Sequence, residues 1–92
     1  MIHPTRIDQV ARILERAGLS EQTVGVLRDA FRDLHLTYCM DEEVGMAEPV
    51  RSGEGFNIYL VAGRGHCLSL TSDLEEATGM VLAKVEAEMQ DD

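Results

Sequence analysis

The chain has 92 residues, of which 45% are hydrophobic, so it is long enough for one domain with one modest core. Its formal net charge at pH 7 is −9. The first 34 residues hold five Arg and five acids, whereas residues 35–92 hold three basic residues and twelve acids, which accounts for the whole excess. Because such an acidic surface repels phosphate backbones and anionic lipid, we expect neither nucleic-acid nor membrane partners.

The expected location is the cytoplasm. No apolar run approaches the roughly 20 residues that a membrane-spanning helix needs. The N-terminal segment "MIHPTRID" lacks the basic and apolar regions of a secretory signal. We therefore expect a single domain over residues 1–92, with both cysteines present as reduced thiols.

Two amphipathic helices are expected first in the chain. Thr5-Arg-Ile-Asp8 has the spacing of a capping box, apolar residues then recur at helical spacing up to Ala17, and Gly18 is a natural stop. Ser20 can cap a second helix. The apolar stripe of that helix is Val24, Leu27, Ala30, Phe31 and Leu34. Together the two helices predict a helical hairpin.

From His35 the apolar pattern switches to period two, which predicts three antiparallel strands in "HLTYCM", "GFNIYLVA" and "HCLSLT". The connection "AGRGH" allows two registers. A two-residue turn at Gly63-Arg64 pairs Phe56, Ile58 and Leu60 with Cys67, Ser69 and Thr71. A three-residue loop, with Gly65 in the left-handed position, pairs them with Leu68 and Leu70 instead. Register follows the apolar face, so we favour the three-residue loop.

A last helix is expected after the strands, because Ser72-Asp-Leu-Glu75 is another capping box. Its apolar side would be Leu74, Ala77, Thr78, Val81, Val85 and Met89. The segment from Asp41 to Gly55, with five acids, three Gly and one Pro, fits no regular structure and is expected to be either a functional loop or a mobile one, of which we favour the mobile loop. The predicted fold is therefore α+β in two layers: an N-terminal helical hairpin, a three-stranded antiparallel sheet and a C-terminal helix.

The stretch "ERAGLSEQTV" resembles a repressor-type helix-turn-helix, but the features of a DNA reader are missing. Leu14 lies where such motifs need a small residue, and Gly25 and Val26 lie where polar groups would face DNA. Arg28 and Arg32 are offset by neighbouring acids, so there is no basic footprint. We interpret the hairpin as structural.

The histidines and cysteines do not have the spacing of a metal site. His35 and Cys39 share a strand face but lie about 13 Å apart by strand rise, and His66 and Cys67 point to opposite faces. The acids that follow Cys39 raise the pKa of a thiol, which disfavours a nucleophile. We therefore predict no metal, no cofactor and no enzymatic activity.

Three segments resemble a known family. "HLTYC", "GFNIYLVAGRGHCLSLT" and "LEEATGMVLA" are similar to a small, uncharacterised family of bacterial proteins encoded among nitrogen-fixation genes. The resemblance implies an accessory role near nitrogenase maturation or its electron supply, and it carries over no catalytic residues.

The function predicted from these observations is that of a small acidic accessory protein that binds another, unidentified protein. The favoured register leaves an uncharged sheet face with an acidic rim, which is typical of a docking patch. The partner-binding residues are predicted to be Tyr59, Cys39, Cys67, Asn57, Thr37 and Ser69, with Tyr59 as the anchor. Two alternatives for this face are closure by a homodimer and cover by the Asp41–Gly55 loop. Alternative functions are a metal- or cluster-handling protein that uses Cys39 and Cys67, and a helix-turn-helix DNA-binding regulator.

Overall fold

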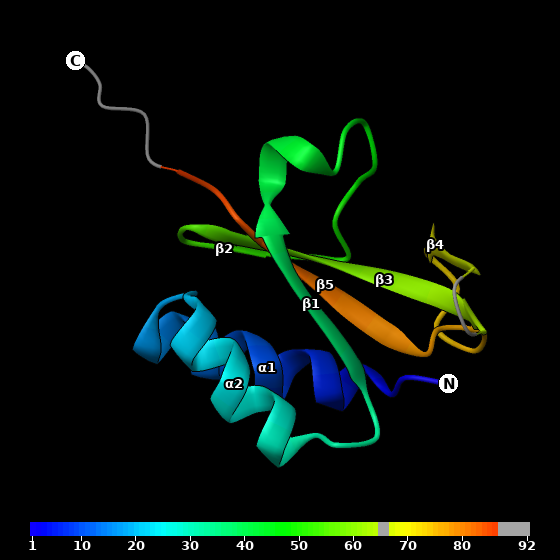
Figure 1. Ribbon diagram of the computed structural model, residues 1–92, viewed down its shortest axis with the longest axis horizontal. Coiled ribbons are helices and arrows are strands. Elements are labelled where there is room, and N and C mark those ends of the chain that lie inside the picture. The colour runs from blue at the N-terminus through cyan, green and yellow to red at the C-terminus, as the bar shows by residue number, and fades with distance from the viewer. Residues whose placement is uncertain (65–66, 87–92) are drawn as a thin grey trace.

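The computed structural model describes residues 1–64 and 67–86, and within them two helices pack on one face of a mixed sheet (Figure 1). The sheet has five strands in the order β1-β5-β3-β2, and β4 also pairs with β3. The elements are α1 (Pro4–Ala17), α2 (Glu21–Ala30), β1 (His35–Met40), the 3-10 helix η1 (Asp41–Glu43), β2 (Arg51–Gly53), β3 (Phe56–Arg64), β4 (Cys67–Thr71) and β5 (Gly79–Lys84). No helix in the described part of the chain is long and apolar enough to cross a membrane.

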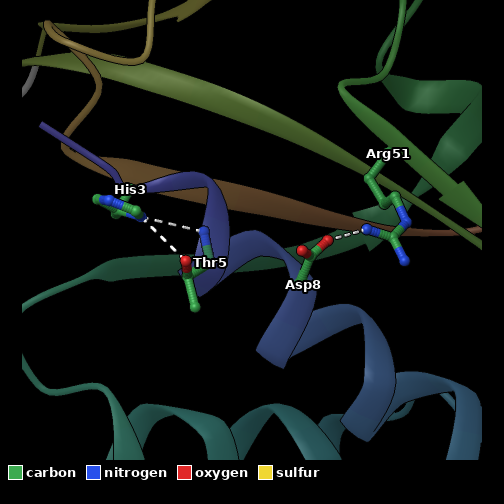
Figure 2. Close-up of polar contacts among 4 residues, drawn as sticks. All are labelled: His3, Thr5, Asp8 and Arg51. Atoms are coloured by element: carbon green, nitrogen blue, oxygen red, sulfur yellow. Dashed lines mark hydrogen bonds and ion pairs between the residues drawn. The ribbon is translucent and has the colours of Figure 1, made fainter.

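The two predicted helices are present, although the first begins differently from the prediction. His3 is the N-cap of α1, and its ring nitrogen accepts a hydrogen bond from the Thr5 N–H at 3.3 Å (Figure 2). Asp8, predicted to complete a capping box, instead forms an ion pair with Arg51 of β2 (Figure 2). Gly18 ends α1 at a φ of 80°, which favours glycine, and Ser20 caps α2 as predicted.

The prediction of a three-stranded antiparallel sheet with a C-terminal helix is wrong. β5 occupies the position between β1 and β3, pairing parallel with β1 and antiparallel with β3. Its residues Gly79 to Ala83 are all buried, so the strand carries apolar side chains on both faces and shows no period-two pattern. A Cβ on Gly79 would lie 2.2 Å from the His35 carbonyl oxygen, so glycine is required where β5 meets β1.

The residues of the second predicted capping box form a short turn instead of starting a helix. The Asp73 N–H donates to Thr71 Oγ1 at 3.0 Å, and the Glu75 N–H donates to Asp73 Oδ1 at 2.9 Å. Ser, Thr and Asp side chains favour turns as readily as helix starts, because both conformations let them accept from nearby N–H groups. Met89, which the prediction placed in the helix, lies outside the described residues.

The favoured register of the β3–β4 hairpin is also wrong. The structure pairs Leu60 with Thr71, so these two share a face as in the rejected alternative, but Gly63 and Arg64 pair with Leu68 and Cys67 instead of forming the turn. Leu70 is 43% exposed instead of lying under the helices. The helix-side core contains Met80 and Leu82 of β5 in place of Leu70. Gly65, proposed for the loop, lies outside the described residues.

Side chains are buried on both faces of the sheet, so the two-layer description is incomplete. The helix-side core includes Phe56, Ile58 and Leu60, as predicted. A smaller cluster on the opposite face consists of Tyr59, Val61, Val81 and Ala83, with Cys39, Val44 and Ala47 packed against it. Figure 1 shows η1 and the following loop on this side, away from the helices. The segment predicted to be a mobile loop therefore contains regular elements and covers part of the sheet.

Candidate functional site

The structure brings together four of the six predicted partner-binding residues. Thr37 and Cys39 of β1 lie on the sheet face opposite the helices, as do Asn57 and Tyr59 of β3. Ser69 pairs with Ala62, which lies two positions after Leu60 and so faces the helices as Leu60 does. By strand alternation Ser69 therefore lies on the helix side of the sheet, away from the other four residues. The backbone of Cys67 lies in β4, and its side chain is outside the described part of the structure.

Tyr59 is not an exposed anchor. Its side chain is only 4% exposed and lies among the residues of the smaller cluster, including Val44 and Ala47 of the loop. Its hydroxyl donates to Asp41 Oδ1 at 2.6 Å, and Asn57 Nδ2 donates to the same oxygen at 3.0 Å. Burial, followed by the hydrogen bond to Asp41, raises the pKa of Tyr59 to about 12. In this structure Tyr59 and Asn57 hold the acidic η1 at the end of β1.

Cys39 is a protonated thiol at neutral pH in this environment. Burial is the main cause that raises its pKa, and the negative charges of Glu43 and Asp41 act in the same direction. If the three predicted strands lay in sequence order, Cys39 and Cys67 would flank the central one, but in the structure both β5 and β3 lie between their strands. At about 4.8 Å per strand step the two backbones are roughly 14 Å apart. Among the described residues, no group of three or more His, Cys, Asp or Glu is placed to hold a metal ion.

β1 has a free edge, because among the described strands only β5 pairs with it. The His35 N–H donates to Thr78 O at 3.3 Å, so the backbone groups of His35, and of every second residue after it, face β5. The backbone groups of Leu36, Tyr38 and Met40 therefore point to the free edge. Arg28 confirms this direction, since its Nε and Nη2 donate to Leu36 O at 3.2 and 3.0 Å. The N–H and C=O groups of Tyr38 and the N–H of Met40 remain available, whereas the Met40 carbonyl, at the N-cap of η1, accepts the first hydrogen bond of that 3-10 helix.

Two hollows lie beside the free edge of β1, on the side where α2 packs. One, of about 690 Å³, is lined by Arg28, Asp29, Arg32 and residues 34–38, and another, of about 370 Å³, by Glu21, Val24, Arg28 and Tyr38. At the far end of β1, Asp41 and Glu42 line a third hollow of about 230 Å³. We call β1, together with Arg28 and the acids of η1, the β1 edge site. Strand periodicity predicted β1, and three strands in sequence order would also place it at an edge, but the sequence did not reveal that β5 is its neighbour.

These features define a small α+β protein in whose mixed sheet, among the described strands, β1 pairs on one side only. Residues 8–85 match the family of unknown function DUF6129, and the chain belongs to that family. No curated protein and no solved structure matches the chain.

Replacing Arg28 by Ala should leave the Leu36 carbonyl without its guanidinium donor. We expect the free energy of unfolding to fall by about 1 kcal/mol, because the side chain is exposed and water partly replaces the bond. Arg32→Ala, which changes a residue lining the same hollow, should shift the stability by about 0.5 kcal/mol or less. Urea unfolding followed by circular dichroism measures both. Equal losses in the two variants would show that the Arg28 bonds do not stabilise β1.

Proposed function

We propose that the protein is a small acidic accessory protein that acts by binding another protein, and that it takes an extended segment of this partner onto the β1 edge. The observation that carries the proposal is the set of unused backbone groups at the edge, the N–H and C=O of Tyr38 and the N–H of Met40, with hollows beside them. Strand addition to a free edge gains main-chain hydrogen bonds, while pockets for alternate side chains give specificity. Of the predicted patch, Thr37 and Cys39 are half-buried on β1 and would border the bound segment.

The charge around the site favours a basic partner segment. Asp41, Glu42 and Glu43 follow β1 directly, and Tyr59 and Asn57 fix the first of them. Complementary charge speeds encounter and selects partners more than it increases affinity. We therefore expect Lys or Arg in the part of the partner that lies next to η1. In this role Tyr59 and Asn57 position the acids and do not touch the partner.

The biological setting rests on the sequence resemblance. The similarity to a family encoded among nitrogen-fixation genes supports a cytoplasmic partner in nitrogenase maturation or electron supply. The alternative functions have weaker support. Cys39 has a raised pKa and is separated from Cys67 by two intervening strands, which disfavours a shared metal or cluster. In α2, Val24 and Leu27 are buried in the core, which supports a structural role for the helical hairpin.

Met40→Pro tests the proposal, because it removes an edge donor at a backbone position that already suits proline. Met40 has a φ of −86°, close to the proline value, and the residue before it is in a strand, as proline prefers. We expect a partner captured from an extract of nitrogen-fixing cells to be retained by the wild type and reduced at least about tenfold by Met40→Pro, which corresponds to the loss of one or two hydrogen bonds. Quantitative mass spectrometry of the captured proteins gives the ratio.

Met40→Ala is the matched control, since it also loses the methionine side chain but keeps the backbone N–H. It should capture the same partner as the wild type. Circular dichroism must show that all three proteins are folded. If Met40→Pro is folded and captures every specific partner as well as Met40→Ala does, then the β1 edge is not the binding site and the proposal fails.

A further inference from the structure

The edge that would receive a partner also has the features needed to pair with itself. We infer that, when no partner is bound, two copies of the chain join antiparallel through their β1 edges, about a two-fold axis beside Cys39. This inference rests on the proposed role of the β1 edge and names the chain that occupies it in the absence of a partner. Partner binding then competes with self-pairing.

The hydrogen-bonding pattern selects the register. Arg28 occupies Leu36 O, so the free groups nearest the end of the edge are the N–H and C=O of Tyr38 and the N–H of Met40. An antiparallel pair centred on Cys39 sets Tyr38 opposite Met40 of the second copy, and Met40 opposite its Tyr38. In each pair the Met40 N–H donates to Tyr38 O, and the Tyr38 N–H donates to Met40 O through the lone pair that η1 leaves free, so two bonds form to unoccupied acceptors and two to shared ones. The bonds between Arg28 and Leu36 stay intact in both copies.

The side chains are compatible with this register. Tyr38 is half-buried and packs against the helix-side core, and Met40 has the same orientation by strand alternation. Tyr38 and Met40 of a second copy would therefore arrive on the helix side of the edge. That is where hollows of about 690 and 370 Å³ lie, each lined by Arg28 and Tyr38. The incoming side chains would fill space that is open in the single chain.

The charges at the two ends of β1 favour the antiparallel arrangement. Arg28 and Arg32, with one acid, Asp29, line the hollow near the start of the strand. The acids of η1 follow its end. Antiparallel pairing brings the acidic end of one copy toward the arginines of the other, whereas parallel pairing would set acids against acids. Since each chain also carries a net charge of −9, the association should be weak and reversible.

Sedimentation velocity of the full chain over a wide range of protein concentrations tests the inference. We expect the wild type and Met40→Ala to shift from monomer toward dimer as concentration rises, and Met40→Pro to stay monomeric. A wild type that remains monomeric at the highest concentration would overturn the inference. A dimer that persists unchanged in a folded Met40→Pro would overturn it as well.

Cross-linking tests the position of the two-fold axis. In an antiparallel pair centred on Cys39, the two Cys39 Cα atoms face each other in a non-hydrogen-bonded pair about 4.5 Å apart, a distance that a disulfide can bridge. Diamide should therefore oxidise the two thiols to a disulfide, taking up two electrons and two protons. A Cys67→Ser background keeps the second cysteine from reacting. The expected product is a dimer on a non-reducing gel that dithiothreitol reverses and that Met40→Pro does not give. A dimeric sample without this cross-link would overturn the register about Cys39.

The two proposals can fail separately. If the wild type is monomeric but partner capture is still lost in Met40→Pro, the self-pairing inference is wrong and the proposed function stands. If the dimer forms and is lost in Met40→Pro while capture is unchanged, the edge serves self-association and the proposed partner site is wrong.

Discussion

Gly79→Ala is expected to lower the free energy of unfolding by roughly 3 kcal/mol or more, a large part of the stability of a small domain. The new Cβ would lie 2.2 Å from the His35 carbonyl oxygen, 2.7 Å from its Cβ and 2.9 Å from its carbonyl carbon. These atoms belong to the backbone of β1 or are attached to it directly. They cannot swing away as the end of a long side chain could, so relief of the clash requires β1 and β5 to separate.

The matched control is Gly25→Ala in α2. A Cβ there would meet nothing within 4 Å, and the residue lies inside a helix. Alanine should therefore stabilise the protein by about 0.5–1 kcal/mol. Urea unfolding followed by circular dichroism should give shifts of opposite sign for the two variants. In the helix predicted from the sequence, Gly79→Ala would also have been stabilising. Stabilisation by Gly79→Ala would thus contradict the strand assignment of β5.

The parts of the fold that were predicted correctly depend on local signals. Helical spacing identified both helices, with Gly18 marking the end of the first and Ser20 the start of the second. These signals are visible in the sequence because capping residues bond to backbone groups a few positions away. Period two identified β1 and β3, each of which has one face toward the helices. The side of β3 that faces the core, with Phe56, Ile58 and Leu60, followed from the same alternation.

The parts that were missed depend on contacts between distant segments. β5 is buried on both faces, so its apolar run fits a helix as well as a strand, and only its pairing with β1 and β3 decides between them. The predicted register of the β3–β4 hairpin was wrong for the same reason. We assumed that Leu68 and Leu70 were needed in the core, but Met80 and Leu82 of β5 take that role.

The candidate site was predicted in part. Alternation placed Thr37 and Cys39 on the same sheet face as Asn57 and Tyr59, which the structure confirms. It could not show that Val44 and Ala47 cover Tyr59, because loop packing has no period in the sequence. It placed β1 at an edge only by assuming that the strands lie in sequence order, and it did not show that the neighbour of β1 is β5.

Tyr59→Asp is expected to unfold the protein, with a loss of roughly 4 kcal/mol or more in the free energy of unfolding. The substitution puts a carboxylate into a cluster with Val61, Val81 and Ala83, where the tyrosine is only 4% exposed. It also replaces the hydroxyl that donates to Asp41 by a second negative charge beside it. Neither the desolvation nor the repulsion is offset by another partner that the described residues supply.

Tyr59→Phe is the control that separates the hydroxyl from the ring. It keeps the packing and leaves Asp41 with the Asn57 donor, so we expect a folded protein that has lost about 1–2 kcal/mol. The hydroxyl also gives a pH signature. The pKa of Tyr59 is raised from 10.0 to about 12, so folding favours its protonated form. Its stabilising contribution is therefore complete below about pH 10 and is lost as pH rises toward 12. The difference in stability between the wild type and Tyr59→Phe should shrink over that window. A Tyr59→Asp variant as folded as Tyr59→Phe at pH 7 would mean that the loop leaves this face open in solution, and the predicted anchor would then be accessible after all.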